Sequence, residues 1–488
     1  MSDGKSGIAT GAAPEKKDVA SSAEQEIAAQ SAWLLLPQHQ GLRLFDDLAR
    51  SEFFDFDRQQ AQADHALSAM VRFAVEKVPF YRDYFVEHGL NADDVRHESD
   101  LKHLPVLDKD TVIAREQSLH AETLPENEKW TWTTYSSGTT GKRTRVRMTH
   151  RANMMFTILV LRQYRWFRFD LSGSLAQILA PRNFADPLDD HPPYDFQEDR
   201  DHWTYASTFF ETGPSYLLSS AQPLEIRQAW LEQKQPGYLA SDPATLEEHA
   251  FSRPSGPVAS SLKGVLGTSS QMTPLMRHRI ERSFQVPVNQ NYGANEIGII
   301  ALRCGAGRYH VQQEHCLVEI TDRHGEAVGP GQQGRILVTG LSNFAMPLFR
   351  YELGDLATVP VDPCPCGRTQ KSFTDIEGRF RRWHNVPPDT HRKYRVITDA
   401  LQSIAPEYLT AVRAYQLHLF IDRRLEFRIQ SGRALPPQVR ESILREWLSN
   451  YPDCADQLEI VRVEQFDIPP NGKLAEFTSD FPDEPFST

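Results

Sequence analysis

Hydrophobic side chains recur at helical spacing in the early part of the chain, before any Gly-rich stretch. Apolar residues within 59–78 repeat at intervals of three and four positions, which predicts an amphipathic helix there. They are Ala63, Leu67, Met70, Val71 and Ala74. The alternation of apolar and polar faces indicates that this helix packs against a core.

Short apolar strands and helical segments then follow one another along the middle of the chain. The predicted helices and strands are, in chain order, 224–233, 237–240, 242–250, 262–266, 276–284 and 286–289. Strands that alternate with helices in this way indicate an α/β domain with a largely parallel sheet. We expect Asn291-Tyr292-Gly293 to form a turn after the last of these strands.

The pattern changes near residue 305, where short β-type segments with glycine turns between them replace the helices. This texture predicts a β-rich subdomain over about 305–378. After residue 379 a strand, strand, helix, strand order follows, in which Tyr415, Leu417 and Leu419 alternate with polar residues. That order predicts a small α+β domain over 379–488.

At 488 residues the chain is long for a single core, and more than one domain is expected. The predicted fold class is α/β, with a large N-terminal domain over 23–378 that has mostly parallel sheets plus the β-rich subdomain. A small, mobile α+β C-terminal domain completes it. Residues 1–22 are rich in Gly, Ala, Ser, Lys and Glu, which predicts a disordered tail.

Charge and composition narrow the functional classes. The net charge of −12 argues against a general nucleic-acid or acidic-membrane surface. No apolar run approaches the roughly 20 residues of a membrane span, and the N-terminus lacks the apolar core of a signal peptide. Five cysteines are too few for a disulfide framework. We expect a soluble cytoplasmic protein without nucleic-acid or membrane partners.

A loop over Thr134–Lys142 combines six hydroxyl side chains and two glycines with a closing lysine. It lies between predicted strands over 130–133 and 143–148, and such a loop can present N–H groups and a cation to a polyphosphate. Ser136 and Arg143 occupy positions where a Walker A motif needs Gly and Ser or Thr, which excludes a P-loop NTPase. The alternative is a surface loop without chemistry.

Polar and glycine-rich turns follow three predicted strands, after residues 133, 266 and 290. Ser269 and Ser270 lie in the second turn. Ligands of parallel sheets bind at the carboxyl ends of strands. The three turns are therefore expected to line one binding site.

Five segments resemble, in order, the motifs of the adenylate-forming superfamily of acyl-CoA synthetases, adenylation domains and luciferases, most closely its phenylacetate-CoA ligase branch. These segments are Ser136–Lys142, Asn291–Glu296, Phe349–Leu356, Gly378–Arg379 and Pro469–Lys473. The resemblance implies that a carboxylate attacks the α-phosphorus of ATP, which releases pyrophosphate and leaves an acyl-adenylate.

The same resemblance implies roles for individual residues. The phosphate-binding residues would be Ser136, Ser137, Gly138, Thr139, Thr140, Gly141 and Lys142. Other nucleotide-binding residues would be Ser269, Ser270, Asn291, Tyr292, Gly293, Ala294, Asn295, Asp355 and Arg379. Tyr292 would stack beside the adenine, and Asp355 would accept hydrogen bonds from the ribose. Glu296 would bind Mg²⁺, a cation that prefers oxygen ligands.

Catalysis would fall to Glu296, Thr139 and Lys473, with Lys473 bridging the carboxylate and the α-phosphate from the small domain. Each residue has an alternative reading when taken alone. Asp355 would be a turn aspartate, Glu296 a helix first-turn acid, and Lys473 a solvated lysine.

Three cysteines and a histidine suggest a second site. Cys304, His310, Cys364 and Cys366 offer the donors of a closed tetrahedral Zn²⁺ site, and relatives carry a similar pattern. The alternative is a set of reduced, buried cysteines. Cys316 is the substitute ligand if Cys304 or His310 proves distant.

Departures from the family pattern leave the acceptor of the activated group open. Asn295 stands where relatives carry Thr or Ser, and Arg381 stands where they carry the pivot aspartate. Pro387 and Pro388 stiffen the following loop. The acceptor could be CoA, a carrier protein or an amine, and the acid could be an unusual oxyacid such as nitrite. A catalytically silent ATP-binding protein is the third alternative.

Aromatic residues suggest an aromatic acid as the substrate. Trp203, Phe209, Phe210 and Tyr216 are candidate walls of the acyl pocket, with ordinary core packing as the alternative. The sequence does not specify whether the chain acts alone or as a homodimer.

Overall fold

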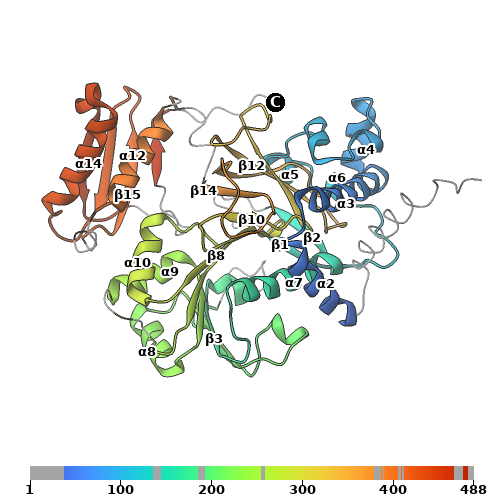
Figure 1. Cartoon of the computed structure of the whole chain (residues 1–488), viewed down its shortest axis with the longest axis horizontal. Coiled ribbons are helices and arrows are strands. Elements are labelled where there is room, and N and C mark those ends of the chain that lie inside the picture. Colours follow the sequence, from blue (N-terminus) through green and yellow to red (C-terminus); the bar gives the residue numbers. More distant parts are fainter. Residues whose placement is uncertain are drawn as a thin grey trace, which may run out of the picture.

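The computed structural model describes residues 38–135, 144–184, 193–253, 256, 259–378, 386–387, 389–404, 408, 411–466 and 476–481. The predicted tail over 1–22 lies outside the described residues. Figure 1 shows a large N-terminal domain, coloured blue to gold, beside a smaller C-terminal domain in orange and red. Among the described residues, no helix has the length and apolar content that crossing a membrane requires.

Short helices begin the large domain. They are α2 (Gln38–Ser51), α3 (Phe56–Lys77), α4 (Pro79–Glu87), α5 (Lys109–Ala114) and α6 (Glu116–Leu119). The predicted helix corresponds to α3, and all five of its periodic apolar residues are buried. The side chain of Asp55 caps α3 by accepting a hydrogen bond from Arg58 N at 2.8 Å, which satisfies an orphan donor of the first turn.

An antiparallel hairpin follows, formed by β1 (Trp130–Tyr135) and β2 (Arg145–Thr149). It leads into α7 (His150–Trp166), which Thr149 caps through its side chain. The strand, loop, strand order is the one that the sequence predicts. The loop that the hairpin carries, residues 136–143, lies outside the described residues.

Five parallel strands form one half of the main sheet, with an antiparallel edge strand. They are β3 (Leu175–Leu179), β5 (Ser215–Ser219), β6 (Tyr238–Ser241), β7 (Gly264–Gly267) and β8 (Val288–Ala294), with β4 (Gln197–Arg200) at the edge. Neighbouring residues point to opposite faces, since Leu239 packs with one apolar cluster and Ala240 with another. The first cluster lies under α8 (Leu224–Lys234), α9 (Pro243–Ser252) and α10 (Pro274–Phe284), and the second under α7 (Figure 1). The α/β fold class is confirmed.

Six antiparallel strands continue the same sheet instead of forming a separate one. They are β9 (Gly298–Arg303), β10 (Tyr309–Val311), β11 (Cys316–Thr321), β12 (Gln333–Gly340), β13 (Tyr351–Thr358) and β14 (Ser372–Gly378). The full order is β11-β12-β13-β14-β10-β9-β8-β7-β6-β3-β5-β4. The predicted turn over 291–293 is wrong, because these residues extend β8 and pair with β9.

The C-terminal domain has its own sheet and core. Its elements are α12 (Thr390–Gln402), β15 (Ala414–Leu419), β16 (Leu425–Gln430), α14 (Pro437–Asn450), β17 (Leu458–Val463) and β18 (Phe477–Ser479). The predicted strand, strand, helix, strand order is present. The sequence missed β18, which joins β15 in parallel at the sheet edge.

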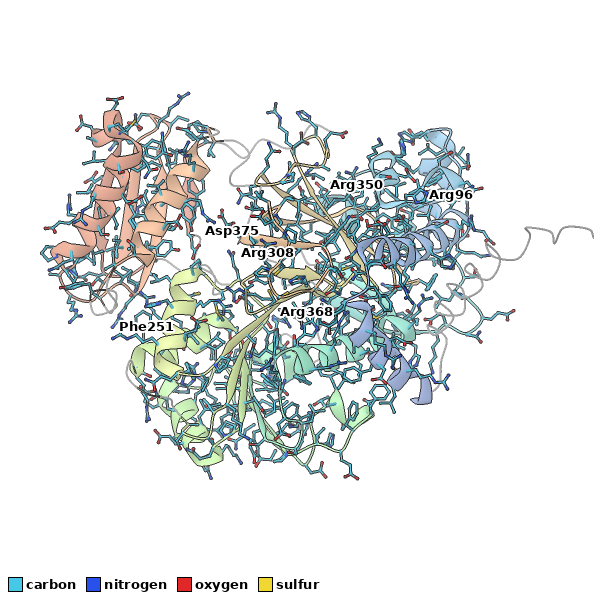
Figure 2. All side chains as sticks on the ribbon, viewed as in Figure 1. Arg96, Phe251, Arg308, Arg350, Arg368 and Asp375 are labelled. Carbon is cyan, nitrogen blue, oxygen red and sulfur yellow. The ribbon has the colours of Figure 1, made fainter. Side chains whose placement is uncertain are left out.

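Two arginines link the domains. Arg395 of α12 pairs with Glu377 at 2.9 Å and with Asp375 at 3.5 Å, both on β14. Figure 2 shows Asp375 on the side of the large domain that faces the small one. From the other side, Arg279 of α10 donates to the carbonyl of Val412.

Candidate active site

Two motif segments far apart in the chain meet through a pair of crossed hydrogen bonds. The hydroxyl of Tyr292 donates to Asp355 Oδ2 at 2.8 Å, across 63 positions. The hydroxyl of Tyr351 donates to Glu296 Oε1 at 2.9 Å, across 55 positions. Each segment therefore supplies one tyrosine and one carboxylate. The structure brings together three of the predicted site residues, Tyr292, Glu296 and Asp355.

Sheet curvature makes this meeting possible. Three strands, β14, β10 and β9, lie between β13 and β8. In a flat sheet with strands about 4.8 Å apart, β13 and β8 would be about 19 Å from each other. The direct contact between Tyr292 and Asp355 shows that the sheet curls here.

A bulge in β13 aims Asp355. Arg335 and Leu337 of β12 pair with Leu356 and Glu352, so β13 has extra residues between these two pairs. Gly354 within this stretch has φ +84°, a conformation that glycine adopts without strain. Such a bulge redirects the side chain that follows it.

Aromatic rings pack against Tyr292. The Phe373 ring meets Tyr292 edge-on at 5.8 Å between centroids and stacks on Tyr309 at 5.7 Å. Burial, with Asp355 adding to it, holds the pKa of Tyr292 well above its ordinary value. The phenol therefore stays protonated and serves as a hydrogen-bond donor to the carboxylate.

Glu296 is buried in the turn between β8 and β9. Burial raises the pKa of its carboxyl, while the Tyr351 hydroxyl and the Lys109 ammonium favour the ionised form. An ionised carboxylate in such a place needs a cation to offset its desolvation. The residue type and the burial suit a Mg²⁺ ligand.

Lys109 is a site residue that the sequence analysis missed. It is the first residue of α5. Two residues earlier, Leu107 N donates to Arg350 O at 3.1 Å, and Leu107 O accepts from Glu352 N at 2.9 Å, so Leu107 is bonded to both neighbours of Tyr351. These bonds tie the residues before α5 to the neighbours of Tyr351, the hydrogen-bond partner of Glu296. No periodicity or spacing in the sequence indicates that Lys109 acts on Glu296.

Asn295 contacts the hairpin that carries the predicted phosphate loop. Its Nδ2 donates to Tyr135 O at 2.8 Å, one residue before the loop begins. Asn343 makes a similar bond from Nδ2 to Arg147 O at 2.9 Å. Gly293 permits close packing of the turn, because a Cβ there would lie 2.4 Å from the carbonyl oxygen of Gly298.

Other predicted nucleotide-binding residues lie at the neighbouring strand ends. Ser269 and Ser270 follow β7, and Ser269 has φ +69°. The amide of Asn291 donates to Gln163 of α7 at 2.5 Å. Ala294 is the last residue of β8.

Several predicted residues lie outside the described part of the chain. They are Ser136, Ser137, Gly138, Thr139, Thr140, Gly141, Lys142, Arg379 and Lys473. Their roles stay predictions.

The structure describes the aromatic residues that were predicted as acyl-pocket walls, and their role in binding stays a prediction. Trp203 is fully buried, and its Nε1 donates to Gly173 O at 3.0 Å, so it belongs to the core. A different aromatic pair, Phe156 and Tyr205, packs edge-on with centroids 5.4 Å apart. This pair lies beside the β8–β9 turn, because a Cβ at Gly298 would be 3.4 Å from the Phe156 ring.

Phe209 and Phe210 pack against the same apolar cluster as Phe156. Phe210 packs on Phe45 of α2 at 5.8 Å between centroids. The ring of Tyr216 on β5 lies under the Lys234 ammonium at 5.0 Å.

The predicted metal ligands form one cluster. Ligand atoms of Cys304, His310, Cys364 and Cys366 all lie within 4.8 Å of one another. The Cys304 and Cys364 sulfurs are 3.6 Å apart, and Cys366 Sγ is 3.3 Å from His310 Nε2. Zn–S bonds of about 2.3 Å in a tetrahedron place two sulfurs about 3.8 Å apart. The donor set and its spacing fit Zn²⁺.

Cys316 is not needed as a substitute ligand. Its thiol is buried and directed at Ile300 O, 3.8 Å away.

Comparison with known proteins gives consistent relatives, although no protein-family model matches the chain. A phenylacetate-coenzyme A ligase of Thermus thermophilus is 26% identical over 382 residues, which cover 73% of this chain and 79% of that protein. One of Aromatoleum evansii is 26% identical over 415 residues, which cover 82% and 89%.

Solved structures show the same fold. The 2-hydroxyisobutyryl-CoA ligase in its postadenylation state aligns with TM-score 0.68 at 16% identity, covering 88% of this chain and 92% of that one. The same ligase in its thioesterification state aligns with TM-score 0.56 at 17% identity, covering 88% and 92%. By sequence the chain is similar to phenylacetate-coenzyme A ligases, and by fold it is similar to a 2-hydroxyisobutyryl-CoA ligase.

Proposed function

We propose that this chain activates an aromatic carboxylic acid with ATP and transfers the acyl group to CoA. The observation that carries the proposal is the crossed pair of tyrosine–carboxylate bonds, Tyr292–Asp355 and Tyr351–Glu296. It gives each of two carboxylates a tyrosine partner from the other motif segment. The names of the sequence relatives, phenylacetate-coenzyme A ligases, support CoA as the acceptor and an aryl acid as the substrate.

Two steps make up the reaction. A carboxylate oxygen of the acid attacks the α-phosphorus of ATP, and the bond to the β-phosphate breaks, so pyrophosphate leaves. The CoA thiolate then attacks the acyl carbonyl, and AMP leaves with the bonding electrons. Asp355 would accept hydrogen bonds from the ribose, with Tyr292 fixing its carboxylate. Glu296 would hold Mg²⁺, which offsets charge on the phosphates.

Phe156 and Tyr205 are the aromatic residues that we assign to the acid site. Their rings lie beside the turn that carries Glu296. Apolar faces in that place favour an aryl group over a charged or strongly polar one.

The four-ligand cluster would hold a structural Zn²⁺. A site with four protein ligands leaves no position for substrate, so the ion would stabilise the fold and take no part in the reaction.

Product analysis tests the proposal. The protein would be incubated with ATP, Mg²⁺ and a panel of aryl acids, with CoA in one set and primary amines in another, and products identified by mass spectrometry. We expect an acyl-CoA, AMP and pyrophosphate with at least one acid. An amide without any acyl-CoA would contradict CoA as the acceptor, and no product in either set would contradict the enzyme assignment.

Matched variants link the products to the site. Asp355→Asn should lower the yield strongly, because the amide cannot accept two ribose hydrogen bonds as a carboxylate does. Asp362→Asn is the control, since Asp362 is exposed on the loop that follows β13. Equal yields from both variants would contradict the role of Asp355.

A further inference from the structure

The main sheet has a short pairing between β10 and β14, which we call the seam. Strand β10 has three residues, and it pairs with β14 at only two positions, Tyr309↔Phe373 and His310↔Ser372. By contrast, β11 and β12 pair at six positions. This two-position ladder is the sheet pairing that joins the described half with β8 and β9 to the half with β13 and β14. A strand this short contributes little pairing energy of its own.

The Cys₃His cluster straddles this seam. Cys304 directly follows β9, and His310 lies in β10. Cys364 and Cys366 precede β14, on the other side. One ion bound to all four would join the two halves at the point where backbone pairing is thinnest.

The nucleotide site spans the same seam. Tyr292 comes from β8 and Asp355 from β13, and their bond crosses β9, β10 and β14. Between them, the stacked rings of Tyr309 and Phe373 are themselves one of the two seam pairs. A shift of β10 against β14 would move Phe373 and change the distance between Tyr292 and Asp355.

We propose that Zn²⁺ bound by Cys304, His310, Cys364 and Cys366 fastens the β10–β14 seam and thereby holds the two halves of the nucleotide site in register. The proposal rests on the proposed function in assigning ATP to Tyr292 and Asp355. The cluster acts as a positioning device: its metal never touches ATP, but it fixes the strands from which the binding residues project.

The loop that supplies two ligands also fastens the N-terminal helices. Arg368, labelled in Figure 2, pairs with Glu52 at 2.9 Å and lies 3.7 Å from the centre of the Trp166 ring. Thr369 accepts from Gln59 Nε2 at 2.7 Å. Metal loss should therefore loosen contacts to α2 and α3 as well as the seam.

The experiment uses the full chain with and without metal. Zinc content would be measured first, with about one ion per chain expected. The protein would then be stripped with a chelator and reloaded with Zn²⁺. Each form would be compared by hydrogen exchange over 309–311 and 372–374, and by ATP binding in calorimetry. These readouts do not depend on turnover.

We expect stripping to raise amide exchange at the seam at least tenfold while leaving β16 and β17 unchanged. The dissociation constant for ATP should rise about tenfold, which corresponds to about 1.4 kcal/mol. Reloading with Zn²⁺ should reverse both effects. Unchanged seam exchange or an ATP affinity within twofold after stripping would overturn the proposal, as would purified protein that holds less than about one tenth of an ion.

Variants distinguish the loss of the ion from a general loss of folding. Cys364→Ser with Cys366→Ser should lose the ion and reproduce the stripped form. His310→Cys keeps four zinc donors and should retain ion, exchange protection and ATP affinity. Cys454→Ser is the matched control, since Cys454 lies in the C-terminal domain away from the cluster. Loss of ATP affinity in the control equal to that in the double variant would overturn the proposal.

Failure of the proposed function would give a different pattern. If metal-loaded wild type bound no ATP, or if Asp355→Asn bound ATP as tightly as wild type, the nucleotide assignment would be wrong. Seam exchange would still report on the fastening role of the metal.

Discussion

At the scale of single residues, the carboxylates of Asp355 and Glu296 differ in their interaction partners. Asp355 receives a hydrogen bond from Tyr292, whose pKa is held well above its ordinary value, so that donor is never lost at physiological pH. Glu296 is buried with Tyr351 and near Lys109. The first arrangement suits a fixed acceptor, and the second suits a cation ligand.

Replacing Tyr292 by Phe removes the donor while keeping the ring. We expect the KM for ATP to rise about tenfold, because a hydrogen bond to a charged group is worth about 1.5–3 kcal/mol and part of that is recovered by solvent. Tyr309→Phe is the control, since it removes a buried hydroxyl that bonds to Gln290 instead. The two would be compared by steady-state kinetics at several ATP concentrations, and equal KM values would contradict the role of Tyr292.

Glu296→Gln tests the metal assignment. We expect kcat to fall at least about 100-fold, or about 2.7 kcal/mol, because a neutral amide holds Mg²⁺ poorly. In wild type the pKa of Glu296 is raised by burial, so its ionised fraction grows as pH rises through that pKa. The Mg²⁺ concentration for half-maximal rate should therefore fall with rising pH. A variant with wild-type rate at every Mg²⁺ concentration would refute the assignment.

At the scale of elements, the β1–β2 hairpin is fastened to the main sheet through side-chain amides. Asn295 and Asn343 each donate to a hairpin carbonyl, those of Tyr135 and Arg147. The hairpin forms its own two-stranded sheet. These bonds therefore help to fix the strand ends between which the predicted phosphate loop runs.

Asn295→Thr installs the residue type that the family resemblance predicts at this position but removes this amide donor. We expect a rise of about fivefold in the KM for ATP, equal to about 1 kcal/mol for one hydrogen bond, with kcat changed less. Asn450→Ala is the control, because Asn450 is exposed at the end of α14. Kinetics of Asn295→Thr indistinguishable from the control would show that the contact does not position the loop.

Local signals account for what the sequence predicted correctly. Thr149 and Asp242 are residue types that favour helix starts, and both cap helices here, while the helices of the α/β region follow from apolar periodicity. The clustering of Cys304, His310, Cys364 and Cys366 was predictable because few residue types bind Zn²⁺ and these four offer its donors. Strand β8 was cut short because its final residues are polar and glycine-containing, and only pairing with β9 makes them extended.

Long-range geometry accounts for what the sequence could not show. The crossed bonds of Tyr292 and Tyr351 depend on the curl of the sheet, which no local pattern encodes. The approach of Lys109 to Glu296 depends on a bridge between Leu107 and Tyr351. Strand β18 was missed because it is three residues long.

At the scale of the whole molecule, a charged contact between the domains surrounds a buried carboxyl. Glu476 accepts a hydrogen bond from Tyr394 at 2.8 Å. Burial, with smaller contributions from Glu377 and Glu247 of the large domain, raises the pKa of Glu476 to about 7, while the Tyr394 hydrogen bond opposes this rise. Tyr415 of β15 also lies close.

Neighbouring cations pair with the other carboxylates of this contact. Arg395 pairs with Glu377, and Arg279 with Glu247 at 2.5 Å. Ionisation of Glu476 would therefore add an uncompensated charge between the domains.

A pH dependence follows from Glu476. Its pKa is raised from 4.5 unfolded to about 7 folded, so the folded state binds the proton more tightly. The stability from this group is fully present below about pH 4.5 and is lost as pH rises through about 7. Urea midpoints for wild type and Glu476→Gln should converge at about pH 4 and differ at about pH 8, with the variant more stable. A difference in urea midpoint that stays the same at all pH values would contradict this dependence.

The central claim is that the chain forms an acyl-adenylate, and isotope exchange of pyrophosphate into ATP tests it most directly. Exchange would be measured with Mg²⁺ and each aryl acid, with CoA left out, because adenylate formation precedes the thiol step. We predict exchange that requires the acid and falls at least about 100-fold in Glu296→Gln. ATP binding without acid-dependent exchange for any acid would contradict the account.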